Sequence, residues 1–187
     1  MKSLIAILGS IGLISSGVSP IIMHEKNDIT LENSNLNNIW NDVGIKHSIA
    51  TPAAGTHDTE DTQTATKATA KINWEDIISQ SNFVNANGYF ALHPYDNAKY
   101  YNIVELKFNA KESTKNLRVW NYSETNDQWA GWGHQTSKIN LTLKAAYNDD
   151  EGITALELIS YIYARTAGSV HECSTTSQVD SIQFLIG

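Results

Sequence analysis

Three of the five tryptophans of the chain lie within Asn116–Gln135, at Trp120, Trp129 and Trp132. Indole rings can stack on the apolar C–H faces of a pyranose, while polar neighbours hydrogen-bond its hydroxyl groups. This stretch contains both kinds of residue, so it is the candidate binding region. The predicted ligand-contacting residues are Arg118, Trp120, Tyr122, Asp127, Gln128, Trp129 and Trp132.

The first part of this stretch alternates as a β-strand does. Leu117 and Val119 would face one side, and Trp120 and Tyr122 the other. Because leucine and valine are typical core residues, we expect the aromatic side to be exposed and a polar turn to follow over Ser123–Gln128. The opposite interpretation, with Trp120 in the core and the other tryptophans covering the end of a sandwich, fits the sequence equally well.

Residue patterns that would support catalysis are sparse. His171, Glu172 and Cys173 are consecutive, and consecutive side chains of a strand face opposite sides, so they do not predict a nucleophilic triad. The chain contains no HExxH, GxSxG, CxxC or glycine-rich phosphate-loop motif. Glycoside hydrolysis would need two convergent carboxylates, and no sequence pattern brings two together. The residues favour a non-catalytic binding protein, with a secreted hydrolase as the alternative.

The net charge and the potential metal ligands limit the classes of partner and cofactor that the sequence favours. The net charge of −7, without a basic patch, argues against a nucleic-acid partner. Asp149, Asp150 and Glu151 form an acidic cluster that could supply oxygen ligands to a structural Ca²⁺, although the EF-hand spacing is absent. No other cofactor is expected. The single Cys173 excludes an intramolecular disulfide.

Residues 1–23 have the composition of a secretory leader. Lys2 precedes the apolar run Leu4–Ile14, and serine- and glycine-rich sequence follows. This run is shorter than the roughly 20 residues that cross a bilayer, so the mature chain is expected to have no membrane-spanning segment. The leader resembles those of secreted and surface proteins of wall-less bacteria, without the cysteine of their lipoproteins. That resemblance implies a secreted or surface-located, non-acylated protein; an uncleaved anchor is the alternative.

Residues 24–71 are predicted to be a linker. Ala50–Lys71 contains no large hydrophobic side chain, so it is expected to remain disordered. Leu31–Ile45 has apolar residues at helical spacing and is compatible with one short helix. The expected organisation is therefore a signal peptide at 1–23, a disordered or weakly helical linker at 24–71 and a folded domain at 72–187.

The folded domain is predicted to be an antiparallel β-sandwich. Asn102–Asn109, Lys138–Ala145 and Val179–Ile186 alternate apolar and polar residues and are separated by polar segments. Thr154–Arg165 combines a capping-box pattern with alternation, and its β-branched and aromatic residues favour a strand. Several short strands at such spacing are typical of a sandwich. The predicted core comprises Val104, Leu106, Phe108, Leu117, Val119, Leu141, Leu143, Ile162, Ile182 and Phe184.

The end of the chain resembles the second half of galactose-binding-like jelly rolls, which include many carbohydrate-binding modules. The likeness rests on the segments INLTLKA and ALELISYIYA and on the terminal VDSIQFLI, in which Asp180 precedes Ile182 and Phe184. It extends over about Ile72–Gly187 and contains no specific motif. It implies a jelly-roll fold and a binding module for a glycan or a host-surface protein. A protein-binding adhesin or effector with a sandwich fold is a further alternative.

Overall fold

The computed structural model describes residues 39–55, 57–72, 78, 80–130, 132–148, 153–168 and 171–186. These residues form nine antiparallel strands of one sheet, which confirms the predicted all-β antiparallel class. The strands are β1 (Ile39–Trp40), β2 (Ile45–Thr51), β3 (Asp58–Ile72), β4 (Ser81–Pro94), β5 (Lys99–Phe108), β6 (Leu117–Ala130), β7 (Gly133–Asn148), β8 (Ile153–Ala167) and β9 (Cys173–Ile186).

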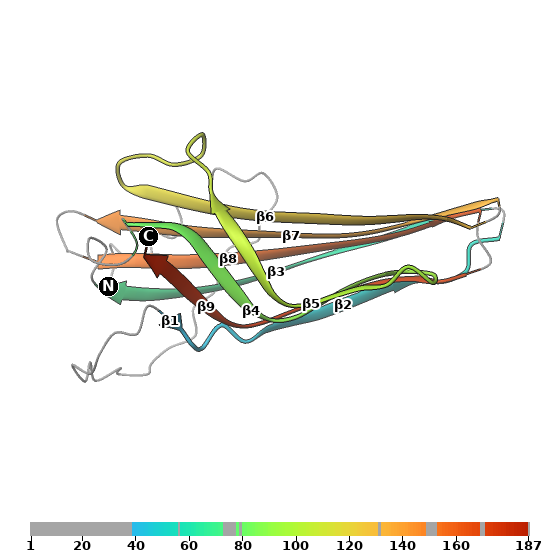
Figure 1. Ribbon diagram of the computed structural model, residues 1–187, viewed down its shortest axis with the longest axis horizontal. Coiled ribbons are helices and arrows are strands. Elements are labelled where there is room, and N and C mark those ends of the chain that lie inside the picture. Colours follow the sequence, from blue (N-terminus) through green and yellow to red (C-terminus); the bar gives the residue numbers. More distant parts are fainter. Residues whose placement is uncertain are drawn as a thin grey trace.

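The sheet is curled so that its two halves face each other. Its strand order is β1-β9-β4-β5-β6-β7-β8-β3, and β2 also pairs with β9. β5 and β6 pair only at Lys107 with Asn121 and at Phe108 with Trp120, so the sheet bends between them. The strands β6, β7, β8 and β3 form one layer, and β4, β5, β9 and β2 lie across from it (Figure 1). The fold is thus one continuous curled sheet.

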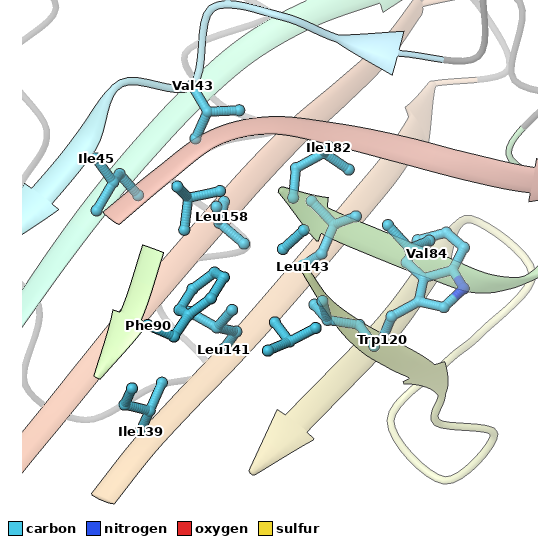
Figure 2. Packing of buried hydrophobic residues seen from close by; sticks show 14 of the residues in the cluster. Val43, Ile45, Val84, Phe90, Trp120, Ile139, Leu141, Leu143, Leu158 and Ile182 are labelled. Carbon is cyan, nitrogen blue, oxygen red and sulfur yellow. The ribbon is translucent and has the colours of Figure 1, made fainter. Parts of the chain in front are cut away.

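Large apolar side chains fill the space between the layers at one end, which we call the wide end. Leu143 and Ile182 are fully buried there with Trp120, and Phe90 and Leu141 continue the apolar core to the middle of the sheet. Figure 2 shows these side chains projecting between the strands. The predicted core is confirmed for Val104, Leu106, Val119, Leu141, Leu143, Ile162, Ile182 and Phe184. Phe108 and Leu117 are only partly buried.

Small polar side chains meet between the layers at the opposite, narrow end. The Oγ1 atoms of Thr51 and Thr166 are 2.7 Å apart, and Ser137 Oγ is 2.6 Å from Thr175 Oγ1. Because these side chains are short, the two layers approach closely enough for direct hydroxyl–hydroxyl hydrogen bonds. We call this group of buried residues the polar seam; it runs from the narrow end to the middle of the sheet, where Ser160 is opposite Leu141, and comprises His47, Thr51, Ser137, Ser160, Thr166, Thr175 and Ser177.

The predicted disordered linker, residues 24–71, is wrong over residues 45–51 and 58–71, which lie in strands, so the sheet begins well before the predicted domain boundary. β2 pairs with β9, and the 15 residues of β3 all pair with β8. The absence of large hydrophobic residues suggested disorder, but β3 is a sheet edge whose side chains are largely solvent-accessible. Backbone pairing with β8 and the strand preference of threonine stabilise it without a large apolar side chain.

Other sequence expectations have mixed outcomes. Thr154–Arg165 is a strand, within β8, as predicted. The polar turn expected at Ser123–Gln128 is wrong, because β6 continues to Ala130. The short helix expected within Leu31–Ile45 is wrong from residue 39 onward, where β1 and an irregular segment lie. The leader at 1–23 and the acidic residues 149–151 lie outside the described residues.

Candidate functional site: the aromatic tip

The candidate site lies at the narrow end, where four strand connections meet. The connections β2–β3, β4–β5, β6–β7 and β8–β9 all lie at this end of the sheet (Figure 1). The register places their ends side by side: Thr51 and Pro94 are both opposite Cys173, and Asp58 and His134 are both opposite Ala167. Loops carried on a rigid sheet are common positions for binding residues.

Trp129 lies on the second-to-last residue pair before the β6–β7 connection. It is opposite His134 in the strand register, and the two rings stack with centroids 4.4 Å apart and planes 13° apart. Asp127 Oδ1 is 3.8 Å from His134 Nε2. Since 74% of Trp129 is exposed, the indole has one face on the imidazole and the rest of its surface open to solvent.

Trp132 is the most exposed large hydrophobic residue of the described chain. Its exposed fraction is 98%, and it lies in the short connection between Ala130 and Gly133. Its backbone lies close to Gly168, because a Cβ built on Gly168 would be 3.3 Å from the Trp132 carbonyl oxygen. Gly168 has φ +59°, so a residue with a side chain would be both strained and crowded there. The indole of Trp132 projects into solvent.

A second aromatic–imidazole pair lies at the same end. Tyr95, in the β4–β5 connection, stacks on His171, in the β8–β9 connection, with centroids 3.6 Å apart. Tyr95 has φ +44°, which is unusual for a residue with a side chain and marks a tightly constrained backbone. We call the exposed surface formed by Tyr95, Trp129, Trp132, His134 and His171 the aromatic tip.

The structure separates the predicted ligand-contacting residues into two groups. Asp127 and Gln128 flank Trp129 near the tip. Trp120 is fully buried and lies nine positions away along β6, roughly 30 Å in a strand. The expectation that Trp120 is exposed is therefore wrong, and it cannot share a surface with Trp129. The core aromatics provide the reason: Phe108 and Phe184 pack edge-on against its ring.

Arg118 and Tyr122 also lie away from the tip. Arg118 Nη2 donates to the Ser81 carbonyl oxygen at 3.1 Å, and its guanidinium lies 4.4 Å from the centre of the Phe108 ring. Burial lowers the pKa of Arg118. Tyr122 is half-buried against the core, and burial raises its pKa, with Glu124 adding to the rise. Both side chains stabilise the sheet at positions remote from Trp132.

Sequence reasoning missed His134, His171 and Tyr95 as site residues. His134 could have been found from the sequence. The connection between β6 and β7 has two residues, and Trp129 and His134 each lie two positions from it, so they are paired in a hairpin. Directly paired residues of adjacent strands have close side chains. The Tyr95–His171 stack joins segments that are 76 positions apart in sequence, and no local pattern predicts that pairing.

The reactive groups of the described residues are buried or engaged. Cys173 is buried and donates weakly to the Thr136 carbonyl oxygen at 3.4 Å. Burial raises the pKa of the Cys173 thiol to about 11. Glu157 is also buried, 3.7 Å from Lys144 Nζ, and burial raises its pKa while Lys144 opposes the rise. His171 stacks on Tyr95, so it does not form a triad with the neighbouring Glu172 and Cys173.

Metal and membrane features were also sought in the described part of the chain. No group of three or more histidine, cysteine, aspartate or glutamate residues there has the geometry to hold a metal ion. Within the same residues, no helix is both long enough and apolar enough to span a bilayer. The proposed Ca²⁺ ligands Asp149, Asp150 and Glu151 lie outside these residues.

Comparisons with known proteins do not show a family for this chain. No protein-family model matches it, and no curated protein matches it. A structure titled as a putative 5-nitroimidazole antibiotic resistance protein from Bacteroides thetaiotaomicron is 8% identical, covers 64% of this chain and 96% of its own, and has a TM-score of 0.19. A putative pyridoxamine 5'-phosphate oxidase from Corynebacterium glutamicum is 10% identical, covers 59% and 99%, and has a TM-score of 0.14. Neither likeness is large enough to support an argument about fold or function.

Proposed function

We propose that the chain is a secreted or surface-exposed binding module that recognises carbohydrate through the aromatic tip. The observation that carries the proposal is the presentation of Trp129 and Trp132, whose exposed fractions are 74% and 98%. Trp129 is held flat against His134, and the backbone of Trp132 is packed against Gly168. Because the Trp129 indole is already held against His134, it loses little conformational freedom when it binds a ligand.

The chemistry of the tip suits a neutral, polyhydroxylated ligand. The free face of Trp129 can stack on the C–H groups of a pyranose ring. Asp127 is exposed on the same side of β6 as Trp129, so its carboxylate can hydrogen-bond sugar hydroxyl groups. Gln128 faces the opposite side of the strand, and its Oε1 atom is buried. Export through the leader at 1–23 and a galactose-binding-like jelly-roll relationship are parts of the same proposal.

A glycan array tests this proposal, with wild-type protein, Trp129→Ala and Trp132→Ala. We expect the wild type to bind a defined group of glycans and each variant to lose that binding. Phe83→Ala is the matched control, because Phe83 is 44% exposed but lies opposite Lys107, near the wide end. Binding of folded wild type to host-surface proteins and to no glycan would instead identify a protein-binding adhesin.

A further inference from the structure

β2 is attached to the sheet differently from the longer strands. Its backbone pairs only with β9 among the described strands, and its buried side chains are alternately apolar, at Ile45 and Ile49, and polar, at His47 and Thr51. His47 Nε2 is 2.9 Å from Ser160 Oγ on β8, and Thr51 Oγ1 is 2.7 Å from Thr166 Oγ1 on the same strand. Two side-chain hydrogen bonds therefore join β2 to β8 across the polar seam.

His47 lies within a chain of buried polar groups. Ser160 Oγ, which contacts His47, is also 2.8 Å from Ser177 Oγ on β9. His47 is only 8% exposed, and both serines are fully buried. A buried network of this kind is stable only while each donor meets an acceptor.

The groups that face His47 are suited to a neutral imidazole. Ser160 on β8 and Ser177 on β9 are uncharged, and within the described residues the second imidazole nitrogen of His47, Nδ1, has no hydrogen-bond partner. On the same side of β3, the charged residues are Asp61 and Lys67. Burial lowers the pKa of His47, and the Gln63 side chain opposes part of that change. No carboxylate of the described residues pairs with His47.

We propose that His47 is a pH-sensitive latch, and that its protonation releases β2 from the polar seam and opens the narrow end. An imidazolium is a donor at both nitrogens, so Ser160 must then accept from His47 and can donate only to Ser177. The added charge would also remain in a buried hydroxyl network without a carboxylate. Separation of β2 allows water to solvate the imidazolium. This inference is independent of the carbohydrate proposal.

The direction of the pH effect follows from linkage. Burial lowers the pKa of His47 below its ordinary value of 6.5 in the closed state, so the open state binds the proton at a higher pH. The closed state is therefore destabilised as the pH falls from about 6.5 to the lower pKa, and the effect is constant below that value. Within this window the equilibrium constant for opening rises about tenfold for each pH unit.

Amide hydrogen exchange of the full chain at pH 7.5 and pH 5.0 tests the latch, after correction for the intrinsic pH dependence of exchange. At pH 5.0 we expect the amide protection of Ile45–Thr51 to be lower than at pH 7.5, by about tenfold for each unit by which burial lowers the pKa of His47. The amide of Leu141 in β7 should stay protected at both pH values. His47→Gln should abolish this pH dependence, whereas His134→Gln, at the tip, should retain it. Equal protection of β2 at both pH values, or the same pH dependence in His47→Gln, would overturn the proposal.

If His47→Gln does not fold, a pH titration of the wild-type protein tests the latch instead. In NMR spectra, the imidazole C–H signals of His47 should titrate with a pKa below about 6.5. They should change together with the amide signals of β2. Titration of His47 at or above that value would overturn the latch.

Discussion

Trp120 Nε1 donates a hydrogen bond to the carbonyl oxygen of Ser81 at 3.1 Å, from a fully buried position. This bond joins β6 to the start of β4, two strands that are not adjacent in the sheet order. It satisfies the only polar atom of the indole inside the core. This buried tryptophan therefore links one layer of the sheet to the other.

Trp120→Ala is expected to destabilise the protein by about 3–5 kcal/mol, because it removes a buried indole and leaves a cavity. Urea unfolding followed by circular dichroism measures this change. Trp132→Ala is the matched control and should alter the free energy of unfolding by less than about 0.5 kcal/mol, since its side chain is exposed. Equal effects of the two substitutions would contradict the assignment of Trp120 to the core.

Alternation identified the strands but not the face of β6 that is buried. The pattern placed Leu117 and Val119 on one side and Trp120 on the other, which the structure confirms. Which side faces the core depends on distant residues: Phe108 and Phe184 form the environment of Trp120. Val119, on the opposite side of β6 from Trp120, is also buried, so both faces of this strand are partly covered. A local pattern contains no information on those long-range contacts.

Gly88→Ala is expected to destabilise the protein by about 3 kcal/mol. Gly88 lies at an irregularity in the pairing of β4 with β9, and a Cβ there would overlap the Gln178 carbonyl group. Because backbone atoms cannot move aside as a flexible side chain can, the strands would have to separate. Thermal unfolding measures this effect. Ala91→Gly, on the same strand, is the reference variant and measures the ordinary cost of a glycine in β4. A change below about 1 kcal/mol would contradict this close approach.

Limited proteolysis is expected to leave a resistant fragment that contains β2 and β3. Both strands pair with the sheet, β2 with β9 and β3 with β8, so their removal would expose two sheet edges. A recombinant chain of residues 72–187 should therefore be less stable than one of residues 39–187, as urea unfolding can show. A fully stable 72–187 fragment would contradict the role of these strands.

β3 was missed in the sequence because its composition is that of a disordered segment. The available signal was weaker: Thr62, Thr64 and Thr66 alternate, and β-branched residues prefer strands. The polar seam could not be predicted at all, because it joins serines and threonines of β2, β7, β8 and β9 that have no common sequence pattern. The exposed tryptophans of the tip, in contrast, follow from the glycine-flanked sequence around Trp132.

Cys173 is expected to react very slowly with a thiol reagent such as iodoacetamide in the folded protein at pH 8. Burial raises the pKa of the thiol to about 11, so the reactive thiolate is scarce at that pH, and the sulfur is also inaccessible. Denaturation should restore ordinary reactivity, because it returns the pKa toward the usual value. Mass spectrometry of the alkylated protein measures the rate; rapid modification of the folded chain would contradict this burial.

The affinity of the purified protein for a glycan identified on the array, measured by isothermal titration calorimetry, tests the central proposal most directly. We expect Trp132→Ala and Trp129→Ala each to weaken binding at least about tenfold, which corresponds to about 1.4 kcal/mol. Phe83→Ala should bind as the wild type does. Equal affinities for wild type, Trp129→Ala and Trp132→Ala, with all three proteins folded, would contradict carbohydrate recognition by the aromatic tip.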